Sequence, residues 1–338
     1  MRLSAMGDVA MTVPVIAALR RAYPELRISI LTRRGFRPFF RDIPDLSFVD
    51  FDPTGRHKGF FGLVRLTGEI RAAGIDTIAD LHDVLRTKVV RTFARLTGIL
   101  FDPGLPESRQ FICRVVRDIV SRYDVDAIHM DDYFYPYPQG GQPFPDGKTY
   151  QRYGASLFDD VSQWRRDNVN RLIKGISDTI RALLPGVKFG ISPFGIYRNA
   201  SDDPSGSATR GLSNYDDLYA DVALWVREGW IDYVLPQLYW ENGHSAADFG
   251  ELLRWWGLHH GRSQLYIGHG AFNISPKGKN TVWRTAEEIC RQVRMQRENP
   301  SAAGSAFYSA RSLVGNAGGL TDSLKTRYYR HPALVPAM

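Results

Sequence analysis

The sequence predicts an α/β protein in which parallel strands are joined by helices. Three observations support this fold class. Short apolar and β-branched runs alternate with longer stretches of helical periodicity along the whole chain. The composition, 43% hydrophobic and 23% charged, is that of a folded protein and excludes disordered, collagen-like and disulfide-stapled classes. The length of 338 residues suits one large domain or two ordinary ones.

The first third of the chain should contain three strands and three helices. Apolar runs predict buried strands at residues 26–31, 46–51 and 75–81. Helical patterns cover residues 9–22, 62–73 and 84–96. We expect the first of these helices to start near Thr12, just before Pro14, and to stop at Tyr23 and Pro24.

The rest of the chain repeats a strand–helix step five times. The expected strands lie at residues 127–130, 188–192, 233–239, 265–268 and 305–309. The expected helices lie at residues 107–123, 153–184, 215–228, 246–259 and 285–299. This spacing is typical of a (β/α) barrel, but a closed barrel needs eight steps, so three are missing on the N-terminal side. Long loops at residues 136–150 and 199–214 follow strand ends, where barrels build their sites, and the second is expected to be mobile.

Charge and cysteine content narrow the possible partners. The net charge is +7, and residues 1–98 supply most of it, with 16 Lys and Arg against 10 Asp and Glu. Such asymmetry suggests two segments of different history, and the basic one favours anionic partners such as phosphates. Nucleic-acid binding is not expected, because no basic run is interleaved with aromatic residues. Cys113 and Cys290 read as ordinary buried thiols, and neither a metal nor a cofactor is expected.

The N-terminus lacks the apolar core of a secretory signal, since Asp8 interrupts it and Arg20 and Arg21 close it. No run approaches the roughly 18 apolar residues of a membrane helix. These features predict a soluble chain that starts in the cytoplasm, without a transmembrane segment. They do not predict an oligomeric state.

The sharpest chemical signal is the run DAIHMDDYFYPYP at residues 126–138, where an apolar strand leads into two carboxylates. Successive strand residues point to opposite sides, so one of Asp131 and Asp132 can face the rim while the other braces the loop. The following rings would stack on sugars and offer hydroxyl groups; they are Tyr133, Tyr135 and Tyr137. The alternative is an Asp pair that only caps the loop.

A second strand, in the run WIDYVLPQLYWENGH at residues 230–244, also ends in aromatic residues and a carboxylate, Glu241. Glycosidases commonly need two carboxyl groups, about 5 Å apart for retention and farther apart for inversion. Asp131 or Asp132 together with Glu241 would meet that need, although Glu241 also fits a surface loop. Further substrate-binding candidates in this run are Gln237, Tyr239, Trp240 and His244.

Weaker candidates lie at other strand ends. Arg198 and His269 would hydrogen-bond a substrate, whereas His129 reads as a satisfied core histidine. Asp8 lies in a short turn before a helix, a position that suits phosphate or an ionised carboxylate. The histidines are too scattered for metal-ligand spacing.

Residues 2–98, from RLSAMGDVAMTVPVIAALRRAYPELRISILTRRGF through DLHDVLRTKVVRTFARLTG, resemble the start of glycosyltransferase family 9, the ADP-heptose:lipopolysaccharide heptosyltransferases. The resemblance implies a partial Rossmann-like α/β segment with Asp8 as its catalytic aspartate. The first strand, the rest of the acceptor domain and the nucleotide-sugar domain have no counterpart in the sequence. A heptosyltransferase-like fragment is therefore the least favoured of three functional hypotheses.

Residues 100–338 resemble the C-terminal part of the glycosyl-hydrolase-like family 10 domain, a TIM-barrel group of bacterial envelope and secreted proteins. The resemblance rests on LFDPGLPESRQFI, YDVDAIHMDDYFYPYP, VKFGISPFGIYRN, GWIDYVLPQLYWENGH and QLYIGHG. It implies that the five strands are the fourth to eighth of the barrel. By analogy with α-galactosidase-like barrels, it implies Asp131 as nucleophile and Glu241 as acid/base.

Together the two resemblances predict a truncated glycosyltransferase-like segment, residues 1–98, and a truncated hydrolase-like barrel, residues 99–338. The join near residues 96–99 cuts both domains, which predicts a chimera. The leading functional hypothesis is a glycoside hydrolase that cleaves O-glycosyl bonds of a bacterial envelope or host glycan, inactive if the incomplete barrel disables it. The alternative is a non-catalytic carbohydrate-binding remnant. The barrel resemblance implies an envelope or secreted location, in contrast to the N-terminus.

Overall fold

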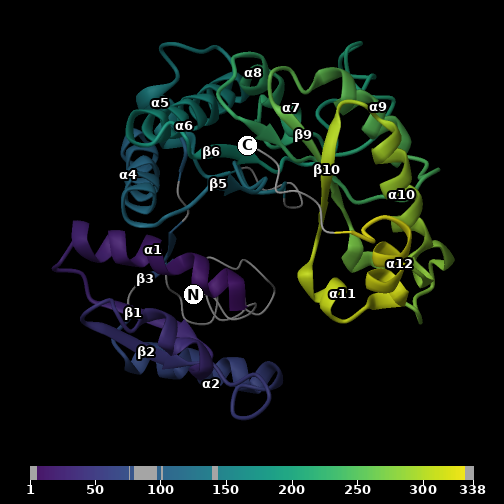
Figure 1. Ribbon diagram of the computed structural model, residues 1–338. Coiled ribbons are helices and arrows are strands. Elements are labelled where there is room, and N and C mark those ends of the chain that lie inside the picture. The colour runs from purple at the N-terminus through teal and green to yellow at the C-terminus, as the bar shows by residue number, and fades with distance from the viewer. Residues whose placement is uncertain (1–5, 76, 80–96, 100–101, 139–143, 332–338) are drawn as a thin grey trace. The chain divides into compact units, whose positions relative to one another are not determined.

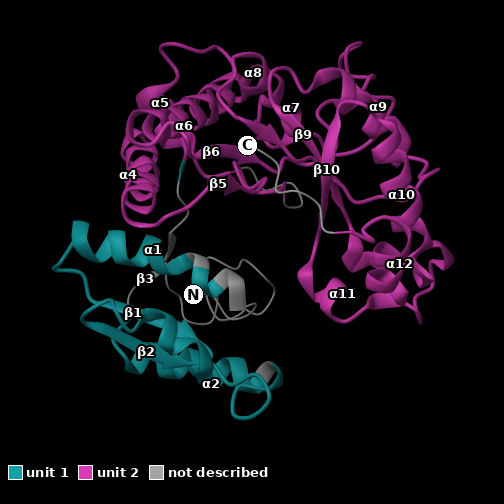
Figure 2. Ribbon diagram, viewed as in Figure 1, with its two compact units in different colours: residues 1–102 teal, residues 103–338 magenta. Residues whose placement is uncertain are grey.

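The computed structural model describes residues 6–75, 77–79, 97–99, 102–138 and 144–331 (Figure 1). The chain divides into two compact units, residues 1–102 and residues 103–338 (Figure 2). Both units combine helices with parallel strands, so the predicted α/β class is confirmed. We describe each unit separately.

The first unit has two pairs of parallel strands, β1 with β2 and β3 with β4. Its elements are α1 (Met6–Ala22), β1 (Ile28–Thr32), a 3₁₀ segment (Arg34–Phe40), β2 (Leu46–Asp50), α2 (Gly59–Ala72), β3 (Thr77–Ala79) and β4 (Thr97–Ile99). The three expected strands are present, and β4 is an addition that the sequence did not predict. The helix expected at residues 84–96 lies outside the described residues. A small apolar core joins β1, the end of β2 and α2 through Leu31, Phe51, Leu63, Leu66 and Ile70.

Helix α1 starts earlier than the sequence predicts. It is helical from Met6 and continues through Pro14. Thr12 is inside the helix, where its hydroxyl donates a 2.7 Å hydrogen bond to the carbonyl of Val9. The expected start at Thr12 is therefore wrong, because a proline removes one helical hydrogen bond without always ending the helix.

The second unit is built on a parallel sheet in the order β10-β9-β7-β6-β5, and β8 also pairs with β9. Its strands are β5 (Ala127–Met130), β6 (Lys188–Ile191), β7 (Tyr233–Val234), β8 (Gln237–Leu238), β9 (Gln264–His269) and β10 (Ala302–Phe307). The five expected strand positions are confirmed, except that Pro236, which has no N–H to donate, separates β7 from β8.

Helices connect these strands along the chain. They are α4 (Pro106–Arg122), α5 (Gly147–Tyr153), α6 (Val161–Leu183), α7 (Asn214–Asp217), α8 (Val222–Arg227), α9 (Phe249–His259), α10 (Glu287–Glu298), α11 (Ala310–Val314) and α12 (Leu320–Arg327). The helix expected at residues 153–184 begins later, as α6, and α5 is a separate helix that ends at Tyr153. The helix expected at residues 215–228 is split into α7 and α8. Figure 1 shows α4, α6, α9 and α10 along one side of the sheet.

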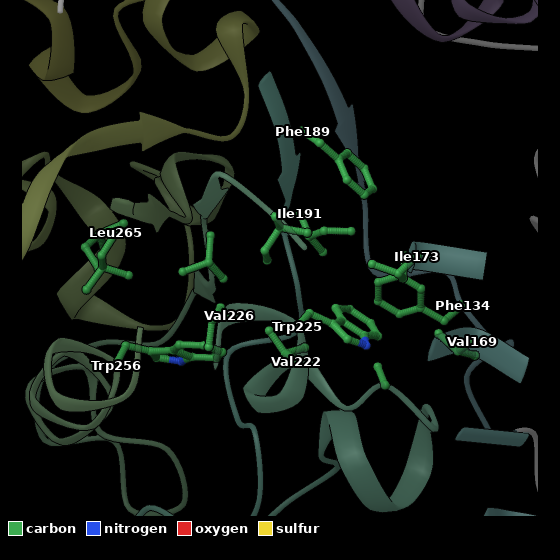
Figure 3. Close-up of a cluster of buried hydrophobic side chains, with 14 of the residues drawn as sticks. Phe134, Val169, Ile173, Phe189, Ile191, Val222, Trp225, Val226, Trp256 and Leu265 are labelled. Atoms are coloured by element: carbon green, nitrogen blue, oxygen red, sulfur yellow. The ribbon is translucent and has the colours of Figure 1, made fainter. Parts of the chain in front are cut away.

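One face of the sheet buries its side chains against these helices. Phe189, Ile191 and Leu265 belong to one buried cluster with helical residues such as Trp225 and Trp256 (Figure 3). Alternate residues of a strand share a face, so the alternation of apolar residues determines which strand residues lie in the core. Burial of this set away from water is the main stabilisation of the unit.

The opposite face carries a row of rings. The Tyr233 hydroxyl and His129 Nδ1 are 3.0 Å apart, their rings are stacked, and Tyr266 meets Tyr233 edge-on. Gly190 is required under this row, because a Cβ there would lie 1.9 Å from the Tyr233 ring. His129 is exposed, so its predicted place in the core is wrong: it is out of phase with the apolar Ile128 and Met130.

Among the described residues, β5 and β10 each pair with a strand on one side only. The sheet is therefore open in the part of the chain that the structure describes. The carboxyl ends of its parallel strands lie along one edge, and loops after those ends carry most of the predicted site residues.

Candidate active site at the carboxyl edge of the sheet

Asp131 lies directly after β5 and is exposed. Gln237 of β8 donates from Nε2 to Asp131 Oδ1 at 2.7 Å, and the same amide donates to the Ser192 carbonyl at 3.0 Å. These bonds connect the ends of β5, β6 and β8. They bring two sequence-predicted site residues into direct contact and hold the carboxylate of Asp131 in a fixed direction.

Asp132 points the other way and is only 2% exposed. The Tyr137 hydroxyl donates a hydrogen bond to its Oδ2. Burial raises the pKa of Asp132 to about 6; the Tyr137 hydrogen bond opposes this shift, and the adjacent Asp131 carboxylate adds to it. The pair therefore combines an exposed carboxylate with a buried carboxyl group that takes up a proton just below neutral pH.

The loop after β5 is anchored by a buried ion pair. Arg165 of α6 donates from Nε and one terminal nitrogen to Asp146, at 2.8 and 2.6 Å, and both side chains are buried. The guanidinium also lies over the rings of Tyr135 and Tyr219. A paired geometry of this kind keeps buried charges solvated by each other and fixes the loop.

Two of the predicted stacking residues, Tyr133 and Tyr135, differ in their exposure to solvent. Tyr133 is 73% exposed and meets Tyr137 edge-on, so its ring remains accessible to a ligand. Tyr135 is buried and packs edge-on against Phe144 and Tyr219. Direct sugar contact by Tyr135 is therefore excluded, because the ion pair and these rings enclose it.

Glu241 has a different set of partners. Its Oε2 accepts a 2.9 Å hydrogen bond from the Trp283 indole, and its Oε1 accepts a 3.4 Å bond from Asn280. Burial acts to raise the pKa of Glu241, but hydrogen bonds, of which that from Trp283 has the largest effect, together outweigh burial and leave the pKa below its usual value. The partners come from the 3₁₀ segment Thr281–Arg284 and its cap, so Glu241 and Asp131 have different hydrogen-bond partners.

The other predicted residues of this segment flank Glu241 in sequence. Tyr239 is half-buried, and burial, followed by the charge of Asp131, raises the pKa of its phenol. The Trp240 ring meets Phe194 edge-on, at 5.4 Å between centroids. His244 accepts the backbone N–H of Ala247 at Nδ1, at 3.1 Å. Of these side chains, Tyr239 is the one whose pKa the charge of Asp131 helps to raise.

Arg198 is held within the loop at residues 199–214 and its flanks. Its guanidinium binds both carboxylate oxygens of Asp216, at 2.9 and 3.1 Å, and one oxygen of Asp203, at 2.7 Å. It also lies over the Tyr215 ring. Asn199 and Ser207 form a further bridge across the loop. The loop expected to be mobile is therefore extensively hydrogen-bonded, and Arg198 serves this loop in the structure.

His269 is completely buried, so its predicted substrate contact is wrong. The ring stacks between Phe249 and Phe307 and meets Gln292 and Ser305 at 3.1 Å each. Burial lowers the pKa of His269 to about 4, which keeps the ring neutral. The physical reason is strand phase, because His269 shares the buried face of β9 with Leu265 and Ile267.

Asp8 lies inside α1, so its expected place in a turn before the helix is wrong. Its side chain is outside the described residues, and its role stays a prediction. Within the described ranges, no three His, Cys, Asp or Glu side chains gather in a way that would hold a metal ion. In the same ranges, no helix combines the length and apolar character that crossing a bilayer requires.

Sequence reasoning missed two rings at this edge, Phe272 and Tyr308, which follow β9 and β10. Both contact Tyr239. An aromatic residue just beyond a strand end was the available signal. The partners of Glu241 gave no such signal, because Trp283 is 42 residues away in sequence.

Comparison with known proteins adds the family. The model of the family described as Glycosyl hydrolase-like 10 matches residues 79–285. Glycosyl hydrolase YngK of Bacillus subtilis (strain 168) is 48% identical over 243 residues, which cover 71% of this chain and 48% of that protein. Glycosyl hydrolase DigH of Escherichia coli (strain K12) is 42% identical over 246 residues, which cover 69% of this chain and 56% of that protein. The chain spans about half the length of these curated relatives.

Solved structures give weaker likenesses. A Bacteroides uniformis β-glucuronidase has a TM-score of 0.38 at 11% identity, covering 73% of this chain and 28% of that one. A glycosyl transferase of family 9 from Veillonella parvula has a TM-score of 0.28 at 14% identity, covering 96% and 94%. Both scores are too low to carry an argument, so the resemblance of residues 2–98 to glycosyltransferase family 9 stays a prediction. The match of residues 79–285, by contrast, covers more than half of the sequence, and the chain belongs to the Glycosyl hydrolase-like 10 family.

Proposed function

We propose that the chain is a glycoside hydrolase that cleaves O-glycosyl bonds of a bacterial envelope or host glycan, with Asp131 and Glu241 as its carboxylate pair. The observation that carries the proposal is the exposed Asp131, which Gln237 holds at the carboxyl edge of the sheet among accessible tyrosine rings. Family membership and the two relatives named glycosyl hydrolases support the same reaction class.

The two carboxylates take different roles in this proposal. Asp131 is the nucleophile, because it is exposed and oriented. Glu241 is the acid/base. Its pKa lies below the usual value in the free protein, and burial already acts to raise it. A glycan laid over Glu241 would add to that burial and favour the protonated form that donates to the leaving group.

The test is hydrolysis of purified cell-wall and host glycans, measured as released reducing ends. Asp131→Asn and Glu241→Gln should each lower the rate by roughly 10³-fold. Asp126→Asn is the matched control, because Asp126 is an exposed carboxylate at the opposite end of the same strand. Activity that survives both site substitutions would remove the proposal.

A second candidate is carbohydrate binding without cleavage. The separate partners of Asp131 and Glu241 favour it, since a carboxylate pair acts only when both groups flank one bond. Calorimetric titration with the same glycans distinguishes the two functions. Binding that is indifferent to Asp131→Asn, with no release of reducing ends, would favour the binding function.

We propose further that the five strand positions of the second unit are the fourth to eighth strands of a TIM barrel, and that the chain joins residues 1–98 of one origin to residues 99–338 of another. The open parallel sheet and the division into units near this boundary support it. The family match begins earlier, at residue 79. Genomic reads across codons 90–105 test the join, and an uninterrupted family sequence there would contradict it.

For location, we propose the cell envelope or the exterior, as the family resemblance implies, rather than the cytoplasm. Fractionation of cells that express the gene, followed by immunodetection in each fraction, tests this. Recovery only in the cytoplasmic fraction would contradict the proposal.

A further inference from the structure

Three aromatic rings meet at the carboxyl edge of the sheet, each from just after a different strand. The rings of Tyr239 and Tyr308 are stacked, with centroids 6.0 Å apart and planes 18° apart. Phe272 stands almost perpendicular to both, at 5.4 Å from Tyr239 and 5.8 Å from Tyr308. We call this set, Tyr239, Phe272 and Tyr308, the aromatic corner.

The aromatic corner is open to solvent. Tyr308, just after β10, is 59% exposed, and Phe272, just after β9, is 49% exposed. Rings of this size normally bury their area, and neighbouring exposed aromatic side chains commonly mark a binding surface. The exposed area of the corner is therefore a feature that a ligand would cover.

The backbone under the corner is fixed. The Phe272 N–H donates to the Tyr308 carbonyl at 2.9 Å, and the Tyr308 N–H donates to the His269 carbonyl at 3.0 Å. Asn273 Nδ2 donates to the Tyr239 carbonyl at 2.9 Å. At Gly270 a Cβ would lie 3.1 Å from the Tyr239 side chain, so glycine allows this close approach. A rigid base means that little conformational entropy is lost when a ligand binds to the rings.

The corner lies within electrostatic reach of the proposed nucleophile. The charge of Asp131 acts on the Tyr239 phenol, and Gln237, two residues before Tyr239, bonds Asp131 directly. A ligand here must therefore offer apolar faces to rings and hydroxyl groups to phenols and a carboxylate. A pyranose with equatorial substituents does both, since its axial C–H bonds form apolar faces and its hydroxyls lie around the edge. A purely apolar ligand would leave the polar groups unpaired.

We propose that Tyr239, Phe272 and Tyr308 form a subsite that binds a gluco-configured pyranose of the glycan, next to the sugar attacked by Asp131. The inference rests on the proposed function, because it places this ring along the same glycan. Stacking holds the sugar plane, and the hydroxyls of Tyr239 and Tyr308 bond its edge.

The test is calorimetric titration of the full chain carrying Asp131→Asn, which prevents turnover, with two β-1,4-linked tetrasaccharides, chitotetraose and cellotetraose. Tyr308→Ala and Phe272→Ala should each weaken binding about tenfold. Tyr308→Phe keeps the ring and should keep most of the affinity. Tyr123→Ala is the matched control: Tyr123 is 48% exposed but follows α4, at the amino end of β5.

Unchanged affinity in both alanine variants overturns the subsite, and so does the absence of binding by both tetrasaccharides to the parent chain. The outcomes also separate the subsite from the hydrolase proposal. If the wild-type chain binds a tetrasaccharide through these rings but releases no reducing ends from any glycan, hydrolysis fails and the subsite stands. If the wild-type chain hydrolyses glycan with a KM that Tyr308→Ala does not change, hydrolysis stands and the subsite fails.

Discussion

The two acidic strand ends of the sheet carry the same kind of group in opposite electrostatic settings. After β5, burial raises the pKa of Asp132 to about 6, and one phenol donates to its carboxylate. After β8, Glu241 is less buried and accepts hydrogen bonds from an indole and an amide, which leave its pKa below the usual value. The balance between burial and donated hydrogen bonds therefore decides the proton affinity of each carboxyl group.

The comparison also shows where a proton can be stored. The β5 end holds the exposed side chain of Asp131 and one buried group, Asp132, whose raised pKa lets it take up a proton just below neutral pH. The β8 end holds a carboxylate that stays ionised until something covers it. Substitutions that reverse burial or hydrogen bonding at either end should reverse these properties.

The largest expected effect is on stability at Asp132. Its pKa in the folded protein is about 6, against an ordinary aspartate value of 3.8, so the carboxylate form disfavours folding by roughly 3 kcal/mol. This destabilisation is absent below about pH 4, grows as the pH rises from 4 to 6, and is complete above pH 6. It grows in that window because the unfolded chain has lost the Asp132 proton while the folded chain still binds it. Asp132→Asn should therefore raise the free energy of unfolding above that of the wild type at pH 8, but not at pH 3.5. Urea denaturation at both pH values measures this difference.

Asp126→Asn, at the other end of β5, should change that free energy by only a few tenths of a kcal/mol at either pH. A stability difference between Asp132→Asn and the wild type that does not vary with pH would contradict the assigned environment of Asp132. The contrast between the two strand ends would then no longer hold, because Asp132 would not have a raised pKa.

The fold was largely predictable, because its signals are local. Each expected strand of the second unit is a short apolar run, and the loops with carboxylates and rings follow those runs directly. The splitting of the third expected strand at Pro236 was also local. By contrast, the pairing of β3 with β4 joins segments that the sequence pattern did not connect.

The site was predictable in position but less so in detail. Asp131 and Gln237 meet although 106 residues separate them, because parallel strands end at one edge. The predictions for His129 and His269 placed both on the wrong face of the sheet. The alternation of apolar residues in their strands indicates the correct face for each. The ion pairs of Arg198 could not be read from the sequence, because many acidic residues in the same loop were possible partners.

A smaller effect is expected at the β8 end, where Trp283→Phe removes the indole donor to Glu241. The pKa of Glu241 should rise, and about 1 kcal/mol of stability should be lost at neutral pH. The sign is opposite to that of Asp132: a lowered pKa stabilises the fold above the ordinary glutamate pKa of 4.5, and this stabilisation fades as pH falls.

A double-mutant cycle of Trp283→Phe with Glu241→Gln isolates this bond from the packing of the buried Trp283 ring. Its coupling energy, from urea denaturation, should be present at pH 7 and absent at pH 3. Coupling that is equal at both pH values would mean that the charge of Glu241 plays no part in the contact.

The smallest expected effect tests the bond that links the two ends. Gln237→Leu preserves the approximate side-chain volume but removes the amide that donates to Asp131 and to the Ser192 carbonyl. Because Asp131 is exposed, the lost bond is partly replaced by water, and kcat for glycan hydrolysis should fall only about threefold to fivefold. Gln264→Leu, an exposed glutamine at the start of β9, is the matched control and should retain full activity. If Gln237→Leu is as active as the control, the orientation of Asp131 does not depend on β8, and the two acidic ends act independently.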